Sequence, residues 1–368
     1  MNRNTISVRE LQQMLEEGKE VTILDVRPQE QREEWMIAGS RHVDAYQRLN
    51  EGDNSVLDKI DLPDGKMVVT VCAAGRTSRI ASEALREKGV NAHSLEGGMR
   101  AWNYAWNTAE IKDDEVTIIQ VRRVAKGCLS YIIGSEDEAV VVDASLDPRV
   151  YVELSNKYHW KIRYVMDTHI HADYVSRTIE LAKETGAMHL FNETAEVEYN
   201  YTPLSDGETV RFGSASLSAV FTPGHTPEST SYLINSNYLL TGDTLFTDGI
   251  GRPDLKADLP KSLEKAAQLY ISIGKILALS REDLLILPAH TSQSISFDKK
   301  IISARLSNLT DKIELLSLEE KEFTRQIMQR IPPTPPNYLQ IAAINKSGNH
   351  EGISLADLEA GANRCAVS

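Results

Sequence analysis

Over the first hundred residues, the period of the hydrophobic pattern alternates between that of a helix and that of a strand. Residues 7–17 (SVRELQQMLEE) place apolar side chains on one helical face and precede Gly18, which predicts an amphipathic helix. Further along, the pattern predicts strands over 20–26, 66–71 and 90–98 and a helix over 78–89. Strands that alternate with helices indicate an α/β domain with a parallel sheet covered on both faces.

From residue 117 onward, the predicted strands follow one another directly. The runs VTIIQVRRV, CLSYIIG and AVVVDAS come before any helix, and a further β-rich stretch covers 208–241. This succession favours an antiparallel or mixed sheet. Long helices are predicted over 260–280 and 298–330.

The stretch between the two halves, residues 106–116, is polar and has no clear period, so we expect a linker there. The predicted organisation is a first domain over 1–105 and a second domain over 117–348. Residues 349–368 are expected to form a C-terminal tail that is loosely held, or helical at best.

Composition and charge limit the classes of partner. A length of 368 residues suits two domains at roughly 150 residues each. The net charge of −13, from 40 Lys and Arg against 53 Asp and Glu, argues against nucleic acids and anionic membrane surfaces as partners. No apolar run approaches the roughly 18 residues that span a bilayer, and the first residues lack the apolar core of a signal peptide. We therefore expect a cytoplasmic protein.

Cysteines are few, at positions 72, 128 and 365, and their spacing fits neither a zinc finger nor a disulfide framework. Cys128 begins a predicted strand and is expected to be buried. Cys365 lies in the predicted tail and is expected to be inert.

Cys72 stands in the run VCAAGRTS, between a predicted buried strand and a predicted helix. A tight loop at a helix N-terminus directs backbone N–H groups and a partial positive charge into one concavity, which favours a sulfur anion such as a persulfide. The predicted cradle consists of the loop residues Ala73, Ala74, Gly75, Arg76, Thr77 and Ser78. A buried strand-end cysteine is the simpler reading. A cysteine-based phosphatase would need an arginine where Ser78 stands.

Residues 5–103 resemble a rhodanese, or sulfurtransferase, domain. The resemblance rests on ILDVRP (23–28), IAGSRHV (37–43), VCAAGRTS (71–78) and LEGGMRAW (95–102), in this order and spacing. It implies that Cys72 is the sulfur-accepting nucleophile, that residues 73–78 hold the persulfide, and that Asp25 and Arg27 are structural. The chain departs from the family pattern at Thr77, where an arginine is usual, and at Trp35 and Met36, where Gly and His are usual.

A second group of polar residues follows the predicted strands of the second half. The run VMDTHIHAD carries His169, His171 and Asp173, which can converge on a metal from one turn. His225 follows in TPGHTP, Asp243 in LLTGDT and His290 in ILPAH, all in loops at strand ends. Such a set is not expected from unrelated core histidines, and it predicts a metal site.

Residues 117–345 resemble the metallo-β-lactamase superfamily, whose fold is an αββα sandwich of two mixed sheets with helices outside. The runs YIIG, VVVDAS, THIHAD, TPGHTPES, GDTLF and GIGRPDL most resemble the persulfide dioxygenases and their glyoxalase II relatives. The superfamily places a second-site histidine where this chain has Tyr174, which weakens a two-metal site.

The resemblance implies one Fe(II) per chain on His169, His225 and Asp243, a facial triad with open positions. His171, Asp173 and His290 would then orient ligands and water. Two alternatives stay open: His171 as a fourth ligand to zinc, or Asp173 and His290 holding a weak second metal. Arg252 could reach an anionic substrate or form a loop salt bridge, and Tyr174 could line the pocket.

Together the two halves predict a bifunctional enzyme that oxidises a thiol persulfide with O₂ and transfers sulfur through Cys72. The carrier thiol could be glutathione, coenzyme A or bacillithiol, and sulfite or thiosulfate would be products or acceptors. The resembled family implies a homo-oligomer. One alternative is a zinc-dependent thioester hydrolase of the glyoxalase II type with an accessory rhodanese domain. A second is a sensing module, in which Cys72 receives sulfur only to regulate a partner.

Overall fold

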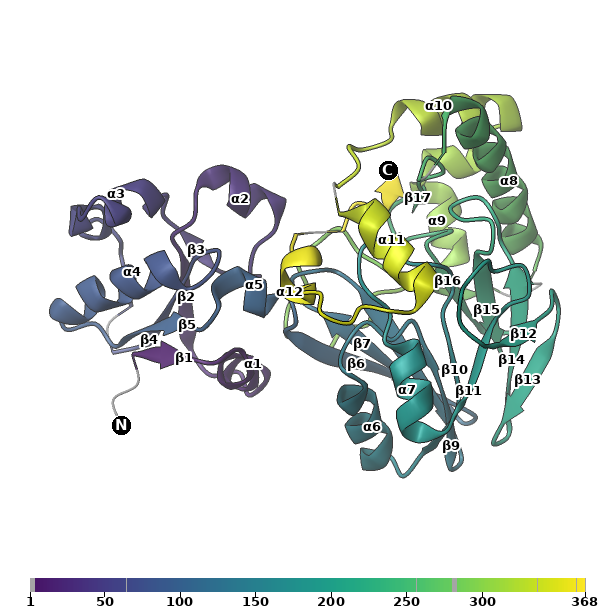
Figure 1. Ribbon diagram of the computed structural model, residues 1–368, viewed down its shortest axis with the longest axis horizontal. Helices are drawn as coiled ribbons and strands as arrows, with labels where there is room; N and C mark the ends of the chain where they lie inside the picture. Colours follow the sequence, from purple (N-terminus) through teal and green to yellow (C-terminus); the bar gives the residue numbers. More distant parts are fainter. Residues whose placement is uncertain are drawn as a thin grey trace.

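The computed structural model describes residues 4–63, 65–255, 257–279, 283–335, 337–361 and 363–367, and the chain forms two units that lie side by side (Figure 1). In the first unit the strands are all parallel and run in the order β1-β5-β4-β2-β3. The central strand β4 is buried almost throughout, as expected for a parallel sheet covered on both faces.

The strands of this unit are β1 Thr5–Ile6, β2 Val21–Asp25, β3 Arg41–His42, β4 Met67–Val71 and β5 Ala92–Leu95. Its helices are α1 Val8–Glu16, α2 Gln29–Glu34, α3 Tyr46–Asn50, the 3₁₀ helix η1 Asn54–Leu57, α4 Arg76–Glu87 and α5 Gly98–Trp102. These elements confirm the predicted parallel α/β domain.

The second unit is a sandwich of two mixed sheets, with strand orders β12-β11-β10-β9-β8-β7-β6 and β13-β14-β15-β16-β18-β19. The first sheet comprises β6 Trp106–Lys112, β7 Thr117–Arg123, β8 Leu129–Ser135, β9 Glu138–Val142, β10 Lys161–Met166, β11 Met188–Asn192 and β12 Thr202–Leu204. The second comprises β13 Thr209–Phe212, β14 Ala215–Phe221, β15 Thr230–Ile234, β16 Tyr238–Gly242, β18 Leu285–Pro288 and β19 Ala304–Arg305.

A small separate pair joins β17 Ile250–Gly251 to β20 Ala366–Val367. The helices of this unit are α6 Pro148–Lys157, α7 Thr178–Thr185, α8 Leu259–Ala278, α9 Leu306–Lys312, η2 Glu314–Ser317, α10 Glu320–Gln329, α11 Tyr338–Ser347 and α12 Leu355–Leu358.

Neighbouring apolar residues in each strand serve opposite faces, because side chains alternate along a strand. Ile133 and Val140 pack between the sheets, with Leu217 and Leu240 of the facing sheet. Their neighbours Ile132 and Val141 pack outward against α6 and α7, and Leu239 and Ile286 pack outward against α8 and α10. Near-continuous apolar strands therefore produce the four-layer αββα arrangement that the sequence predicts.

Three stretches differ from their predicted structure. The expected linker, residues 106–116, begins with β6, an edge strand in which Asn107 and Ala109 are buried while Glu110 and Lys112 are exposed. The helix expected over 298–330 begins only at α9, because Gln120 exchanges two hydrogen bonds of 2.9 Å with the backbone of Ile302 and keeps that segment extended.

The expected loose tail is well ordered. It contains α12 and β20, and Leu358, Cys365 and Val367 are buried. Glu359 forms an ion pair of 2.8 Å with Arg123 of β7, and both side chains are 0% exposed. The Glu359 backbone carbonyl also accepts a bond of 2.9 Å from the Lys126 ammonium group, and these contacts fix the tail to the sandwich.

The two units share one apolar boundary. Trp102 of α5 is buried, and its ring centroid lies 6.3 Å from that of Phe297 in the second unit. Helix α12 lies beside α5 (Figure 1), and Arg100 of α5 forms an ion pair of 2.9 Å with Asp357 of α12. Among the described residues, no helix is both long and apolar enough to cross a membrane.

The buried pair predicts a large loss of stability when one partner is removed. Glu359→Gln leaves the Arg123 charge buried without its counter-ion and should lower the free energy of unfolding by about 3–5 kcal/mol. Asp357→Asn, two residues away, breaks an ion pair whose side chains are 55% and 59% exposed, and should change it by less than about 1 kcal/mol. Denaturant unfolding of both variants measures the difference, and equal losses would contradict this account of the tail.

Candidate metal centre and sulfur-carrying loop

The topology of the sandwich brings several strand ends to one edge. In the first sheet, β9 and β10 are parallel neighbours, so Asp143 and the loop with His169 leave the sheet side by side. In the second, β16 is parallel to β18 and lies two antiparallel pairings from β14, so the loops with His225, Asp243 and His290 leave in one direction.

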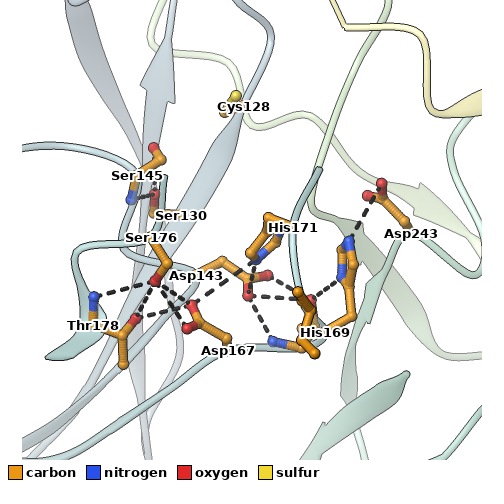
Figure 2. Close-up of polar contacts among 12 residues, drawn as sticks. Cys128, Ser130, Asp143, Ser145, Asp167, His169, His171, Ser176, Thr178 and Asp243 are labelled. Carbon is orange, nitrogen blue, oxygen red and sulfur yellow. Dashed lines mark hydrogen bonds and ion pairs between the residues drawn. The ribbon is translucent and has the colours of Figure 1, made fainter. Parts of the chain in front are cut away.

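Three of these residues form a compact trio. His169 Nε2 lies 3.7 Å and His225 Nε2 lies 3.5 Å from Asp243 Oδ2, and the three atoms are within 4.8 Å of one another. The side chains are buried, and within the described part of the chain none of the three atoms has a hydrogen-bond partner. Two imidazoles and a carboxylate left together in this way fit a divalent metal. Figure 2 shows His169 directed at Asp243.

Hydrogen bonds to the other ring nitrogens set the direction of both imidazoles. His169 Nδ1 lies 2.9 Å from the Thr168 hydroxyl, which itself donates to the Asp143 carboxylate at 2.9 Å. His225 Nδ1 lies 2.8 Å from the backbone carbonyl oxygen of Arg252. Each Nε2 is therefore turned toward Asp243, as in metal sites whose histidines are oriented by a partner on the far nitrogen.

Burial also keeps the two imidazoles in the form that binds metals. It lowers the pKa of His225 to about 4, and it lowers the pKa of His169 well below its ordinary value, with His171 adding to the effect. Both rings are therefore neutral near pH 7, as metal ligation requires.

His171 lies beside His169 and is held through its Nε2 atom, while its Nδ1 atom is buried without a hydrogen-bond partner among the described residues. Its Nε2 lies 2.9 Å from Asp143 Oδ1 and 2.8 Å from the hydroxyl oxygen of Tyr174 (Figure 2 shows the first contact). Tyr174 is fully buried and its ring stacks on His171, so the residue expected to line a pocket lies in the core. The phenol and Asp143 thus engage the Nε2 atom of His171, and the Nδ1 atom is the one that remains as a ligand atom, so the alternative of His171 as a fourth ligand stays open.

His290 connects the trio to Asp173. Its Nδ1 lies 2.5 Å from Asp243 Oδ1, and its Nε2 lies 2.8 Å from Asp173 Oδ2. Asp173 Oδ2 also accepts from the Cys128 thiol at 3.3 Å and from the Asn363 amide at 2.8 Å. These residues orient Asp243 so that one of its oxygens is engaged by His290 and the other faces the two histidines.

Arg252 does not extend toward a substrate. It is fully buried, and its guanidinium donates to both carboxylate oxygens of Asp254 at 2.8 Å and to the Thr334 hydroxyl at 2.6 Å. Of the two roles considered for Arg252, contact with an anionic substrate or a salt bridge within its loop, the structure shows the salt bridge.

A cavity of about 500 Å³ is lined by residues that follow His169 and His225 in sequence, and none of the trio is among its lining residues. Ile170 and Ala172 from the His169 loop and Thr226 from the His225 loop line one side of it. The rest of its lining carries both charge signs, from the residues Lys261, Lys265, Lys346, Glu196, Glu228 and Glu264.

Two positions that lie next to the metal-centre residues were not identified from the sequence. Asp143 ends the apolar run VVVD at φ +59°, and its carboxylate binds both Thr168 and His171. Its strand-end position was a usable signal, the same one that marks His169 and Asp243. Cys365, expected to be inert, is buried beside Asp243 and His290, and no sequence signal places the tail there.

In the first unit, Cys72 directly follows β4, and the loop 73–75 joins it to α4. Its sulfur accepts from the Gly75 amide at 3.2 Å and from the Ser78 hydroxyl at 3.3 Å, and Gly75 takes φ +88° to make the turn. The loop therefore presents donors to the sulfur, as an anionic sulfur would require. Arg76 and Arg79 line a cavity of about 240 Å³ next to this loop.

The first residues of α5 pack against the Cys72 loop and fix its backbone. The amides of Met99 and Arg100 donate to the carbonyl oxygens of Cys72 and Ala73 at 2.8 and 3.0 Å. A Cβ at Gly98 would lie 2.2 Å from the Cys72 carbonyl oxygen, so only glycine permits this approach. The Gly-Gly of LEGGMRAW thus fixes the shape of the sulfur-carrying loop.

Comparisons with known proteins agree with both resemblances. A family model of the rhodanese-like domain matches residues 7–105, and one of the metallo-beta-lactamase superfamily matches residues 123–290. Human mitochondrial persulfide dioxygenase ETHE1 is 29% identical over 171 residues, which cover 44% of this chain and 63% of that protein. The bovine enzyme of that name is 24% identical over 230 residues, 58% of this chain and 88% of that protein.

Hydrolases are also similar. A probable hydroxyacylglutathione hydrolase of Schizosaccharomyces pombe is 27% identical over 191 residues, 49% of this chain and 70% of that protein. Among solved structures, a Staphylococcus aureus metallo-beta-lactamase has a TM-score of 0.59 at 26% identity, over 64% of this chain and 74% of that one. ETHE1 from Myxococcus xanthus has a TM-score of 0.54 at 23% identity, over 66% of this chain and 100% of that one, a likeness of fold.

The geometry of the trio predicts that a divalent metal stabilises the protein. Fe(II) added without oxygen at 100 times its dissociation constant should add about 2.7 kcal/mol to the free energy of unfolding. His225→Ala should abolish most of this gain because it removes one of the three ligand atoms. His159→Asn, an exposed position at φ +61°, is the control and should keep the gain. A gain unchanged in His225→Ala, read from thermal unfolding with and without metal, would exclude the trio as the site.

Proposed function

We propose that this chain, which joins a rhodanese-like domain to a metallo-β-lactamase superfamily domain, is a bifunctional enzyme of sulfur metabolism. The second domain oxidises the persulfide of a small thiol, and the first transfers sulfane sulfur through Cys72. The observation that carries the first activity is the buried trio of His169, His225 and Asp243, while Tyr174 and Asp143 engage His171.

Two histidines and one carboxylate are the donor set of non-haem Fe(II) oxygenases, and iron held there would supply open positions for O₂ and a substrate sulfur. The reaction is R–S–SH + O₂ + H₂O → R–SH + SO₃²⁻ + 2 H⁺. The protein's part is to hold the donors in place: Thr168 and Arg252 fix the two imidazoles, and His290 fixes the carboxylate of Asp243. Burial of the trio excludes bulk water from the reacting sulfur.

The charges around the cavity lined by the His169 and His225 loops favour a zwitterionic thiol carrier. Lysines and glutamates stand together in its lining, so a carrier with both carboxylate and ammonium groups finds partners of each sign. Glutathione has both kinds of group, whereas coenzyme A presents mainly phosphates. We therefore propose glutathione persulfide as the substrate.

The first domain would exchange sulfane sulfur with the same pool of small molecules. The Cys72 thiolate takes the terminal sulfur of a persulfide and releases the thiol, and sulfite then takes this sulfur to become thiosulfate. Gly75 and Ser78 donate to Cys72 Sγ, the atom that accepts and then releases the transferred sulfur, and Arg76 and Arg79 provide positive charge beside the loop for sulfite. One chain that carries both sites raises the local concentration of the shared sulfite.

A zinc-dependent thioester hydrolase of the glyoxalase II type is the second candidate. Asp173 and His290 stand beside Asp243, where a second metal would bind in such enzymes, and hydroxyacylglutathione hydrolases are among the similar proteins. A dinuclear hydrolase holds two zinc ions and the dioxygenase one iron, so metal content separates the two candidates.

The first prediction of this proposal concerns oxygen uptake. Protein loaded with Fe(II) under anaerobic conditions should consume O₂ when glutathione persulfide is added and form one sulfite per O₂. His225→Ala should lower the rate at least 100-fold, because a ligand of the proposed iron is lost, and His159→Asn should not change it. No uptake with any thiol persulfide, together with thioester cleavage by the zinc-loaded protein, would favour the hydrolase.

The second prediction separates the two activities. Cys72→Ser should abolish thiosulfate formation from persulfide and sulfite, because Ser lacks the nucleophilic sulfur, and should leave the O₂ uptake of the second domain intact. The matched control is Cys128→Ser, which removes a buried thiol far from this loop and should keep thiosulfate formation. Unchanged thiosulfate formation in Cys72→Ser would show that Cys72 is not the nucleophile.

A further inference from the structure

The segment Asn363–Val367 has no part in the proposed reaction, yet it lies against the metal centre. Its strand β20 pairs with β17, and the backbone amide of Arg252 donates to the Cys365 carbonyl oxygen at 3.0 Å. The Asn363 side chain accepts from the Cys365 amide at 2.8 Å and donates to Asp173 at 2.8 Å. The backbone around Cys365 is therefore fixed on both sides.

A glycine determines how close this segment comes to the trio. A Cβ at Gly251 would lie 1.8 Å from the Asp243 carbonyl oxygen, so β17 runs directly against the loop that carries Asp243. Strand β20 pairs with β17, so Cys365, the residue directly before β20, lies next to Asp243 and His290. One ligand atom each of Asp243, His290 and Cys365 lie within 4.8 Å of one another, and all three side chains are at most 2% exposed.

The Cys365 sulfur is only weakly held by its other neighbours. The Asn363 amide lies 3.6 Å from it and the Tyr338 hydroxyl 3.8 Å, both long contacts. The Oδ2 atom of Asp243 is buried without a hydrogen-bond partner among the described residues. A thiol directly before the paired strand β20 thus lies beside a carboxylate whose Oδ2 atom has no partner among the described residues.

We propose that Cys365 supplies a sulfur ligand to the metal held by His169, His225 and Asp243 when no substrate is present. The metal–sulfur bond forms as the thiol proton leaves to solvent, with no change of oxidation state. Thiolates are strong ligands for zinc and suit iron as well, so this ligand adds to the histidines and the carboxylate without altering the class of metal.

The same contacts place Cys365 where a substrate sulfur arrives. It packs with Ala172, Leu255, Tyr338 and Ala342, and these four residues also line the cavity of about 500 Å³. The persulfide of a bound substrate therefore displaces the Cys365 sulfur and takes its position. Arg252 links the two ligands, since its amide binds the Cys365 backbone and its carbonyl binds His225.

The inference rests on the metal centre and not on the reaction, because a zinc hydrolase with the same trio would bind Cys365 equally. It is tested with the full chain loaded with Zn²⁺ or Co²⁺ in the absence of thiols. X-ray absorption of the zinc protein should show one sulfur neighbour at about 2.3 Å besides nitrogen and oxygen neighbours at about 2.0–2.1 Å. This measurement needs no variant, so a folding defect cannot obscure it.

Substitution of Co²⁺ for the metal shows which residue supplies the sulfur ligand. The Co²⁺ protein should show a sulfur-to-metal charge-transfer band that is lost in Cys365→Ser at unchanged metal content and retained in Cys128→Ser and Cys72→Ser. Addition of glutathione persulfide without oxygen should change the band in the wild type. A zinc spectrum with nitrogen and oxygen neighbours alone, or a cobalt band that survives in Cys365→Ser, overturns the proposal even where O₂ uptake supports the proposed function. A band lost only in Cys128→Ser overturns it as well.

Discussion

One oxygen of a buried carboxylate, Oδ2 of Asp243, is the constraint on which the site depends. Its other oxygen is engaged by His290, while Oδ2 faces the Nε2 atoms of His169 and His225 and has no hydrogen-bond partner among the described residues. An unpaired buried charge is strongly unfavourable. A divalent cation satisfies all three atoms together, so the hydrogen bonds around the trio maintain an arrangement whose stable form contains a metal.

The remaining structure keeps this arrangement rigid. Parallel neighbouring strands bring Asp143 and the His169 loop to one edge, and the facing sheet contributes Asp243 and His290. The tail closes the same edge: the buried ion pair of Arg123 with Glu359 fixes its start, and the β17–β20 pairing fixes its end. The wall of the metal centre therefore combines loops from both sheets with the last described residues of the chain.

The sequence predicts those parts of the molecule that depend on local pattern. Apolar runs followed by a polar residue identify the strands and place His169, His225, Asp243 and His290 at their ends. The sequence pattern does not predict which ring nitrogen of His169 and His225 faces Asp243. The contacts with Thr168, Asp143 and the Arg252 carbonyl oxygen decide this, and they form only in the folded chain.

The sequence-based errors have a common cause in long-range contacts. Strand β6 was predicted as a linker because an edge strand shows polar residues on its open face. The tail was predicted to be loose because the pairing of Glu359 with Arg123, and of β20 with β17, joins positions more than 100 residues apart. Arg252 is not among these errors, because the sequence left both a substrate contact and a loop salt bridge open, and its contact with Asp254 selects the salt bridge.

The central claim is that the trio holds one metal ion. Crystals grown without oxygen from iron-loaded protein, with anomalous diffraction measured at the iron edge, test it most directly. The account predicts one iron per chain, bonded to His169 Nε2, His225 Nε2 and Asp243 Oδ2. Two metal ions, with the second between Asp173 and His290, would contradict it and would establish the dinuclear site of a hydrolase.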